Sequence, residues 1–408
     1  MNCRFCSTKL IQEFVDLGSC PPSNSFVKKE NINTPEVYYP LKLFVCSNCF
    51  LVQIAEYKKA NEIFNNEYVY FSSFSKSWLE HARNYSEMMI KRFNFNGKSQ
   101  VIEIASNDGY LLQYFKQKNI PVLGIEPTSN TAAAAEKKGI DTIVDFFGIK
   151  LAKELYAQNK KADLLLGNNV LAHVPDINDF VAGMKIILKP NGIITMEFPH
   201  LVKLIENNQF DTIYHEHFSY LSFTTVNSIF TKHGLEIFDV DEIPTHGGSL
   251  RIYAKHPENI LLAIEQRVSA LLYKEKELGI KSMSYYKLFQ DKVEKIKSDL
   301  CLFLQNAKSS NKKVVAYGAA AKGNTLLNYC GIKDDLIDFV VDASPHKQEK
   351  YLPGSHILVV TEQKIKKEKP DYILILPWNI KDEIIQHLSY INEWGGKFVI
   401  AIPNLIIC

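Results

Sequence analysis

Alternating strand-like and helix-like segments limit what this chain can fold into more than any other feature. The run VIEIASNDGYLLQYF, residues 101–115, reads as a short apolar strand, a polar turn with Gly109 and the start of an amphipathic helix. Strand-like runs PVLGIEP, KADLLLGNNV and NGIITMEFP follow, with helical stretches between them. Strands and helices that alternate at this spacing predict a parallel, doubly wound α/β sheet.

A second series of the same kind occupies the C-terminal part of the chain. It contains VVAYGAAAKGNTLL, LIDFVVDASPHKQ, PDYILILPWN and GKFVIAIPNL, after a charged helical stretch at about 256–312. A chain of 408 residues is also too long for one ordinary hydrophobic core. We therefore predict a zinc-binding module at 1–66, a central Rossmann-like domain at 67–255, and a helical connection with a second Rossmann-like domain at 256–408.

The first segment is expected to bind zinc through two pairs of cysteines. Each pair has two residues between its thiols, which lets both sulfurs reach one ion from a tight turn. Four thiolates leave no coordination position open, so this Zn²⁺ is expected to be structural rather than catalytic. The predicted ligands are Cys3, Cys6, Cys46 and Cys49.

Composition excludes some partners. The 47 basic and 45 acidic residues give a net charge of only +2, which argues against a protein that binds nucleic acid electrostatically. No apolar run has the length needed to span a bilayer, and the N-terminus MNCRFCSTKL lacks the apolar core of a signal peptide. A cytoplasmic protein without membrane or nucleic-acid partners is expected. The oligomeric state stays open, a monomer included.

The first strand–turn–helix unit points to a cationic cofactor. Its turn lacks the G-x-G-x-x-G pattern that lets a pyrophosphate approach the backbone. It carries acidic side chains instead, which would repel phosphate and suit the amine and sulfonium of S-adenosylmethionine. The strand ends that follow should complete the site, with an acidic residue for ribose hydroxyls. The predicted cofactor residues are Glu103, Ala105, Ser106, Asn107, Asp108, Gly109, Glu126, Pro127, Asp145, Phe146, Asn168 and Asn169.

The cluster Tyr214-His215-Glu216-His217 has three readings: a metal site, an acid–base centre or a polar strand end. A zinc protease needs H-E-x-x-H, and the second histidine would fall on Ser219, so that reading fails on spacing. In an extended strand Tyr214 and Glu216 would share one face, and the two histidines would share the other. An acid–base centre therefore requires a turn or bulge here.

Taken together, these motifs resemble the zinc-containing sugar C-methyltransferases over almost the whole chain. The resemblance includes both cysteine pairs, YVYFSS, EIASNDGYLL, GIEP, NNVLAHVPD, YHEHFSY, HGGSLR and GAAAKGNTLLN, in that order. It implies transfer of a methyl group from S-adenosylmethionine to a carbon of a nucleotide-linked keto-deoxysugar, for surface polysaccharide or a glycosylated metabolite. It also implies a C-terminal domain that helps hold the nucleotide sugar. The implied active-site residues are Tyr68, His173, Tyr214, Glu216 and His217, with His215 left structural.

Methylating a carbon requires removal of a proton beside a ketone and stabilisation of the enolate oxygen. Histidine is the base best matched to neutral pH. We therefore predict His217 as the base at C3 of a 4-keto sugar, Glu216 as a group that orients it or assists proton transfer, and Tyr214 as a hydrogen-bond donor near the keto oxygen.

The substrate is expected to lie toward the second domain. Its turn, residues 318–323, does not match Walker A, since Lys322 precedes the glycine, but a small-residue turn with a lysine at a helix start suits a diphosphate. HGGSLR offers further polar contacts, and a strand-end aspartate could bind ribose or cap a loop. By resemblance, residues 71–73 shape the same side. The predicted substrate residues are Phe71, Ser72, Ser73, His246, Arg251, Lys322, Asn324 and Asp342.

Three other functions compete with this reading. Transfer of the methyl group to oxygen or nitrogen needs only deprotonation of a heteroatom. A dinucleotide-dependent oxidoreductase is disfavoured because both turns lack G-x-G-x-x-G. A zinc-ribbon protein that binds RNA is disfavoured by the low net charge.

Overall fold

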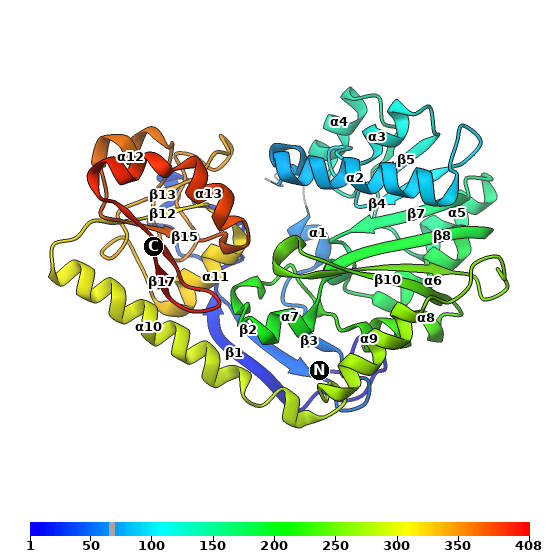
Figure 1. The fold of residues 1–408 in the computed structure, drawn as a ribbon, viewed down its shortest axis with the longest axis horizontal. Coiled ribbons are helices and arrows are strands. Elements are labelled where there is room, and N and C mark those ends of the chain that lie inside the picture. Colours follow the sequence, from blue (N-terminus) through cyan, green and yellow to red (C-terminus); the bar gives the residue numbers. More distant parts are fainter. Residues whose placement is uncertain (65–69) are drawn as a thin grey trace.

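Two α/β lobes and a small N-terminal module make up the chain (Figure 1). The structure is a computed structural model that describes residues 1–64 and 70–408. Each lobe is built on its own sheet, and a third sheet belongs to the module. The expected α/β class, with two Rossmann-like sheets beside an N-terminal cysteine cluster, is confirmed. None of the helices in the described residues is long and apolar enough to cross a membrane.

The central lobe has a seven-stranded sheet in which β4 stands near the middle. The five strands from β6 to β8 are parallel, and β11 and β10 add an antiparallel hairpin at one edge. The sequence did not predict this hairpin, which carries the HGGSLR segment. In sheet order the strands are β10 (Glu236–Ile243), β11 (Ser249–Lys255), β8 (Leu188–Pro199), β7 (Ala162–Asn168), β4 (Val101–Ile104), β5 (Val122–Ile125) and β6 (Thr142–Ile143).

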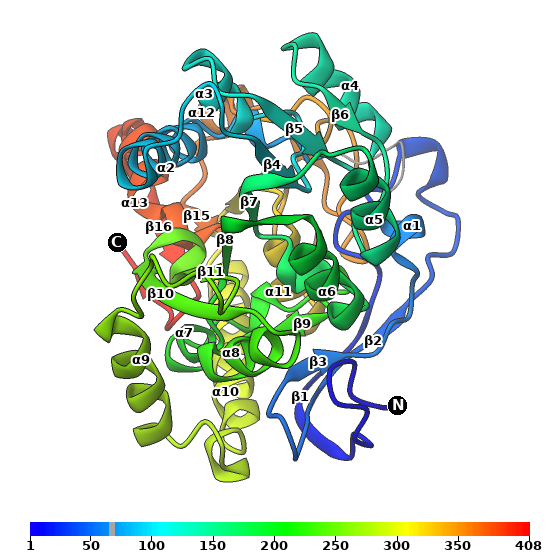
Figure 2. The same cartoon turned by 90° about the vertical axis from the view of Figure 1, so that its right-hand side faces the viewer.

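Helices cover both faces of the central sheet (Figure 2), and alternate residues of the central strands face opposite layers. Val101 packs toward α2, α3 and α4, whereas Ile102 and Ile104 pack toward α5, α6, α8 and α9. Burial on both faces explains why these strands read as continuous apolar runs. The helices are α2 (Lys76–Phe93), α3 (Leu112–Gln117), α4 (Ser129–Lys137), α5 (Ile149–Ala157), α6 (Ile177–Ile187), α7 (Leu201–Glu206), α8 (Phe223–Lys232) and α9 (Gln266–Glu277).

The C-terminal lobe repeats the doubly wound arrangement. Strand β12 lies between β13 and β15, five strands are parallel and only β17 is antiparallel. The sheet order is β14 (Val359–Val360), β13 (Val340–Val341), β12 (Val314–Tyr317), β15 (Tyr372–Ile375), β16 (Lys397–Ile400) and β17 (Ile406–Ile407). Its helices are α10 (Phe289–Ser309), α11 (Ala321–Cys330), α12 (Gln363–Glu368) and α13 (Lys381–His387).

The N-terminal module contacts both lobes. Its strands β1 (Gln12–Cys20), β2 (Tyr39–Val45) and β3 (Val52–Ile54) pair antiparallel and precede the short helix α1 (Ala60–Ile63). A fourth strand, β9 (Ser219–Tyr220), comes from the central lobe and pairs with β3. On the other side Phe14 stacks on Phe289 of α10, with ring centroids 4.8 Å apart. The module therefore packs directly against the part of the central lobe that carries the YHEH segment.

Candidate active site and zinc centre

A cavity of about 570 Å³ lies where the two lobes and the module meet. Its floor is formed at the carboxyl ends of β4, β5, β6 and β7, where ligands bind in sheets of this kind. The predicted residues that line it are Ser72, Ala105, Asn107, Glu126, Pro127, Asp145, Phe146, Asn168, Asn169, His173, Tyr214, Glu216, His217, His246 and Lys322. Tyr68 lies outside the described residues, so its predicted role stays a prediction.

The YHEH segment forms a tight turn, which removes the conflict that strand alternation posed. The backbone N–H of His217 donates to the carbonyl of Tyr214 at 3.0 Å. The turn brings the hydroxyl of Tyr214 to 2.8 Å from Nε2 of His217, with both side chains on the cavity wall. His215 points the other way, packs against Tyr39 and Tyr57 and contacts the carbonyl of Pro40 through Nε2.

The hydrogen bonds of His217 define its tautomer. Nδ1 lies 2.9 Å from the carbonyl of Thr212, so it carries the proton and donates. Nε2 therefore holds the lone pair and accepts from the phenol of Tyr214. Burial lowers the pKa of His217 well below its ordinary value, which keeps the ring neutral at pH 7. The residue has the state that a general base requires.

Glu216 is held differently from our prediction. We predicted that it orients His217 or assists proton transfer. The Thr212 carbonyl has the orienting place, and the Glu216 carboxylate accepts two hydrogen bonds from Nδ2 of Asn24, at 2.8 and 3.0 Å. Burial raises the pKa of Glu216 to about 7. The ring of His173 lies 4.5 Å from that of His217, with Nδ1 directed at the carbonyl of Glu216.

The two sides of the cavity carry opposite charge. The central lobe contributes the acidic side chains of the described lining: Glu126, Asp145, Asp176, Asp179 and Glu216. Two lysines, Lys322 and Lys347, line the cavity in the described part of the chain, and both belong to the C-terminal lobe. Nζ of Lys322 lies 4.6 Å from the ring centroid of Trp378 and donates to Oδ1 of Asn379 at 2.6 Å. The cavity thus suits a cation on one side and an anion on the other.

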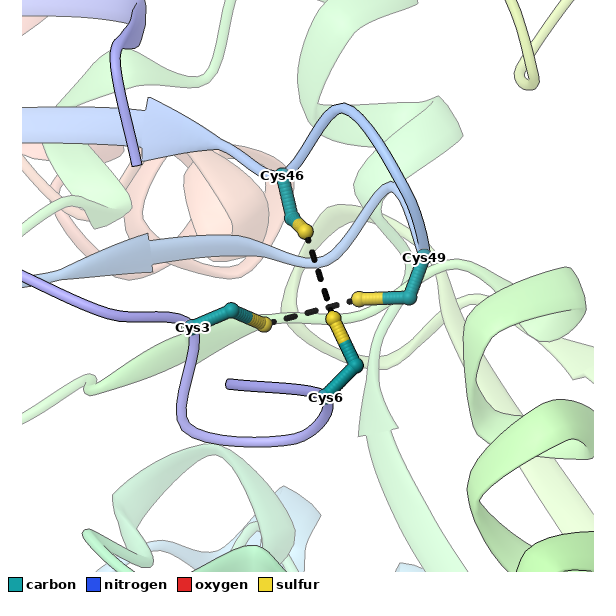
Figure 3. A group of neighbouring side chains, drawn as sticks. All are labelled: Cys3, Cys6, Cys46 and Cys49. Carbon is teal, nitrogen blue, oxygen red and sulfur yellow. Dashed lines mark hydrogen bonds between the residues drawn. The ribbon is translucent and has the colours of Figure 1, made fainter. Parts of the chain in front are cut away.

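Beyond the cavity, four of the five cysteines of the first segment, Cys3, Cys6, Cys46 and Cys49, converge as predicted (Figure 3). The Sγ atoms of Cys3 and Cys49 are 3.5 Å apart, as are those of Cys6 and Cys46, and all four lie within 4.8 Å of one another. Sulfurs bound tetrahedrally to one Zn²⁺ at about 2.3 Å would lie about 3.8 Å apart. The donor set and its spacing therefore fit a closed zinc site, and Nε2 of Gln53 donates to Cys3 at 3.2 Å.

Comparison with known proteins identifies the family. Three family models match: a zinc binding domain at 3–64, a methyltransferase domain at 78–240 and a C-methyltransferase C-terminal domain at 244–403. C-methyltransferase NovU of Streptomyces niveus is 33% identical over 403 residues, covering 99% of this chain and 96% of that protein. The chain belongs to the zinc-binding C-methyltransferase family. It is an S-adenosylmethionine-dependent enzyme that methylates carbon.

Other similarities to this C-methyltransferase are partial. The ubiquinone biosynthesis O-methyltransferase of Rhodopseudomonas palustris is 25% identical over 113 residues, which is 26% of this chain and 45% of that protein. The solved structure of PH0226 from Pyrococcus horikoshii is 14% identical, covers 46% of this chain and 95% of that one, and has a TM-score of 0.39. The full-length similarity therefore decides between carbon and heteroatom methylation in favour of carbon.

The floor of the cavity fits the cofactor of the C-methyltransferase. Neither carboxylate oxygen of Glu103 has a hydrogen-bond partner among the described residues, and the same holds for Nδ2 of Asn168 and Oδ1 of Asn169. Burial raises the pKa of Glu103 well above its usual range, because the carboxylate has lost its hydration, and a cation bound beside it would stabilise the charged form. The aromatic side chains of Phe146 and Phe147 lie at the cavity rim, where an adenine face could stack.

Four predicted cofactor residues are not among the described residues that line the cavity: Glu103, which lies on β4, and Ser106, Asp108 and Gly109, which lie in the loop after it. Ala105, Asn107 and Gly109 all have left-handed backbone torsions, which produces a sharp turn after β4. A Cβ at Gly109 would lie 3.0 Å from Ile140, so the glycine permits close packing. Glu126 accepts from the backbone N–H of Asn107 at 2.9 Å and so fixes the loop.

Five predicted substrate residues lie away from the described cavity lining. Their side chains have structural partners: Arg251 donates to Glu197 at 2.8 Å and Asn324 to the carbonyl of Ser23 at 2.6 Å. Asp342 accepts from the backbone N–H of Ala319 at 2.8 Å, which is the capping alternative stated above. Phe71 stacks on His346, and the hydroxyl of Ser73 accepts from Lys138. The geometry gives no support to direct substrate contacts by these side chains.

The sequence also missed residues that line the cavity. Lys347 follows β13, and its position after a parallel strand was a signal that could have found it. Asn379 follows β15 in the same way. Asn24, in contrast, lies in a loop of the zinc module, and nothing in its local sequence connects it with Glu216.

Glu216→Gln should stabilise the C-methyltransferase at alkaline pH. The pKa of the buried carboxyl is raised from 4.5 to about 7, so folding loses stability as pH rises through that window, where only the unfolded chain ionises freely. The neutral amide avoids this cost, which at 1.36 kcal/mol per pH unit is on the order of 1–3 kcal/mol above pH 7. Urea unfolding of both proteins at pH 5 and pH 8 measures it, and an equal difference at both values would contradict it.

Proposed function

We propose that the enzyme transfers the methyl group of S-adenosylmethionine to C3 of a nucleotide-linked 4-keto-deoxysugar. The single observation that supports this proposal is the charge division of the cavity, whose wall also carries the hydrogen-bonded pair Tyr214 and His217. A cationic cofactor and an anionic nucleotide sugar would enter opposite sides, and the carbon to be methylated would lie between them. The product is a branched keto-sugar that is still linked to its nucleotide.

On the acidic side, Glu103 and Glu126 at the ends of β4 and β5 would hold the cofactor, with Asn168 and Asn169 beside the methionine part. Asp145 and Phe146 would contact the adenosine part. Bound there, S-adenosylmethionine supplies an electrophilic methyl group. The work left to the protein is to generate a nucleophilic carbon and to aim it at that group.

His217 removes the C3 proton. Its Nε2 lone pair faces the cavity, because Thr212 fixes the Nδ1–H tautomer. A buried imidazole resists gaining charge, but here the imidazolium forms beside the negative charge of the enolate, so the two charges arise together and offset one another. Burial also lowers the pKa of the neighbouring His173 to about 4, so that ring stays neutral at pH 7 and places no positive charge beside His217.

Tyr214 stabilises the enolate oxygen. In the absence of substrate its hydroxyl donates to Nε2 of His217 at 2.8 Å. Turning the same O–H toward the 4-keto oxygen frees the lone pair of His217 and supplies a donor where negative charge develops. Glu216 lines the same cavity, and its pKa of about 7 suits it to take up the proton that His217 must release before the next cycle.

Lys322 and Lys347 hold the diphosphate. Lys322 is at the start of α11, where the positive end of the helix dipole adds to its charge, and Lys347 donates to the carbonyl of Ala319 at 2.8 Å, beside the same turn. Two ammonium groups on one side of the cavity match a diphosphate better than a neutral sugar. His246, which contacts Asn169 at 2.6 Å and lines the same cavity, would contact the sugar.

The test is mass spectrometry with labelled cofactor across a panel of nucleotide 4-keto-sugars and the corresponding free sugars. We expect label on carbon of the nucleotide-linked substrates only. Without methyl transfer, with S-adenosylhomocysteine in place of the cofactor, C3 deuterium should wash out into water. Equal methylation of free sugars would overturn the nucleotide-linked substrate. No loss of deuterium from any keto-sugar would overturn the enolate route.

A further inference from the structure

We propose that the C-terminal lobe positions the catalytic turn, through two hydrogen bonds from Thr325 and Trp378 to the segment just before it. The inference rests on the proposed function in one respect, the role of His217 as base. It assigns to Thr325 and Trp378 a positioning role in addition to the substrate contacts proposed for their lobe.

Both hydrogen bonds cross from the C-terminal lobe to the central lobe. Oγ1 of Thr325, on α11, donates to the carbonyl of Ile213 at 2.8 Å. Nε1 of Trp378, at the start of the 3-10 turn Trp378–Ile380, donates to Oδ2 of Asp211 at 2.7 Å. Thr325 and Asp211 are fully or almost fully buried, and Trp378 is 8% exposed, so water does not compete well for either bond.

The two bonds enclose the residue that orients the base. Thr212 lies between Asp211 and Ile213, and its carbonyl accepts the Nδ1–H of His217. Fixing the side chain before Thr212 and the carbonyl after it restricts the torsions that decide where the Thr212 carbonyl points. If this carbonyl turned away, Nδ1 would lose its acceptor and the other tautomer, with a proton on Nε2, would become populated. That tautomer cannot accept the C3 proton at Nε2.

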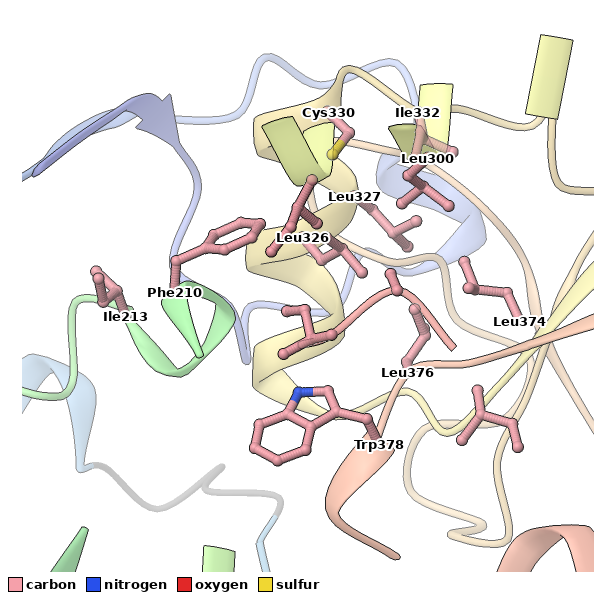
Figure 4. Packing of buried hydrophobic residues seen from close by; sticks show 14 of the residues in the cluster. Phe210, Ile213, Leu300, Leu326, Leu327, Cys330, Ile332, Leu374, Leu376 and Trp378 are labelled. Atoms are coloured by element: carbon pink, nitrogen blue, oxygen red, sulfur yellow. The ribbon is translucent and has the colours of Figure 1, made fainter. Parts of the chain in front are cut away.

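Apolar packing supports the same contact. Figure 4 shows Phe210 and Ile213 on the side of α11 that carries Leu326, with Trp378 below them, and all four belong to one buried cluster. Trp378 also packs against the loop that carries His246, since a Cβ at Gly247 would lie 2.4 Å from the indole ring. The residue next to that glycine is His246, so one indole supports both loops.

Thr325→Val tests the proposal, since it keeps the shape of the side chain and removes the donor. We expect kcat to fall on the order of tenfold with KM for the nucleotide sugar and affinity for the cofactor unchanged. Thr325→Ser, which restores the hydroxyl, should recover most of the rate. Trp378→Phe removes the other donor and should lower kcat in the same direction, should Thr325→Val fold poorly.

The tautomer of the His217 imidazole can be measured directly, and this measurement tests the positioning role without depending on the substrate. In ¹⁵N NMR spectra the wild type should show the Nδ1–H tautomer of His217, and Thr325→Val a mixture. Tyr286→Phe is the matched control, since it loses a buried hydrogen bond of 2.7 Å to the carbonyl of Ile280, away from the cavity, and should leave both kcat and tautomer unchanged. An unchanged tautomer and kcat in Thr325→Val would overturn the positioning role. Altered His217 signals in an enzyme that does not accept nucleotide keto-sugars would instead overturn only the proposed substrate.

Discussion

Replacing His217 by glutamine should lower kcat by at least about a hundredfold, within the range that a positioned general base contributes. Glutamine can still donate to the Thr212 carbonyl, so the turn should keep its shape, but it has no basic lone pair for the C3 proton. Cofactor affinity should be unchanged, because the floor of the cavity is built by other strand ends. Washout of C3 deuterium should fall in parallel with methyl transfer, since both need the same proton removal.

The matched control is His215→Gln, two residues away on the same turn. His215 is equally buried, but it packs against Tyr39 and Tyr57 on the far side from the cavity. Its replacement should cost stability and leave kcat within a few-fold of wild type. Equal loss of kcat in both variants would mean that the turn has collapsed, and wild-type turnover in His217→Gln would remove His217 as the base.

The fold could be predicted to a large extent because its signals are local. Strand–helix alternation and buried apolar runs define both doubly wound sheets, and the cysteine spacing defines the zinc ligands. The antiparallel hairpin β10–β11 could not be predicted in this way. Its strand β11 carries Arg251, a charged residue that is buried only because Glu197 on the neighbouring β8 pairs with it at 2.8 Å, and pairing of this kind leaves no periodic signature.

The site could be predicted less completely, because its decisive partners are distant in sequence. The orientation of the His217 imidazole depends on a backbone carbonyl, that of Thr212, and residue type does not reveal which carbonyls are free to accept. Glu216 is held by Asn24, 192 positions away, and Ile213 by Thr325, 112 positions away. Residue types indicated acid–base chemistry, whereas the assignment of orienting groups required the tertiary structure.

These distant contacts make the zinc module part of the catalytic support. Strand β3, which follows the second cysteine pair, pairs with β9 directly after the turn, and Asn24 of the same module binds Glu216. Nη2 of Arg4, which lies between the first two cysteines, donates to the carbonyl of Ile54, and Nη1 donates to that of Pro175 on the cavity wall. Loss of the metal should therefore affect activity as well as stability.

Cys46→Ser should remove the structural zinc and with it much of the stability of the module. Structural Zn²⁺ sites contribute on the order of 10 kcal/mol to the folding of small modules, more than a four-stranded sheet of this size can replace. We expect less than one zinc per chain by elemental analysis, a first unfolding transition at lower temperature, and methyl transfer reduced by at least about tenfold because β9 and Asn24 lose their support. Chelation of the wild type should reproduce these effects.

Cys408→Ser is the control for the loss of a thiol, because Cys408 is exposed at the C-terminal end and far in sequence from the metal ligands. It should keep one zinc per chain, the wild-type unfolding temperature and full activity. If Cys46→Ser kept its zinc, the four-thiolate site would be wrong. If it lost zinc but kept wild-type turnover, the module would stabilise itself without supporting the turn, and the contacts of β9 and Asn24 would have no part in catalysis.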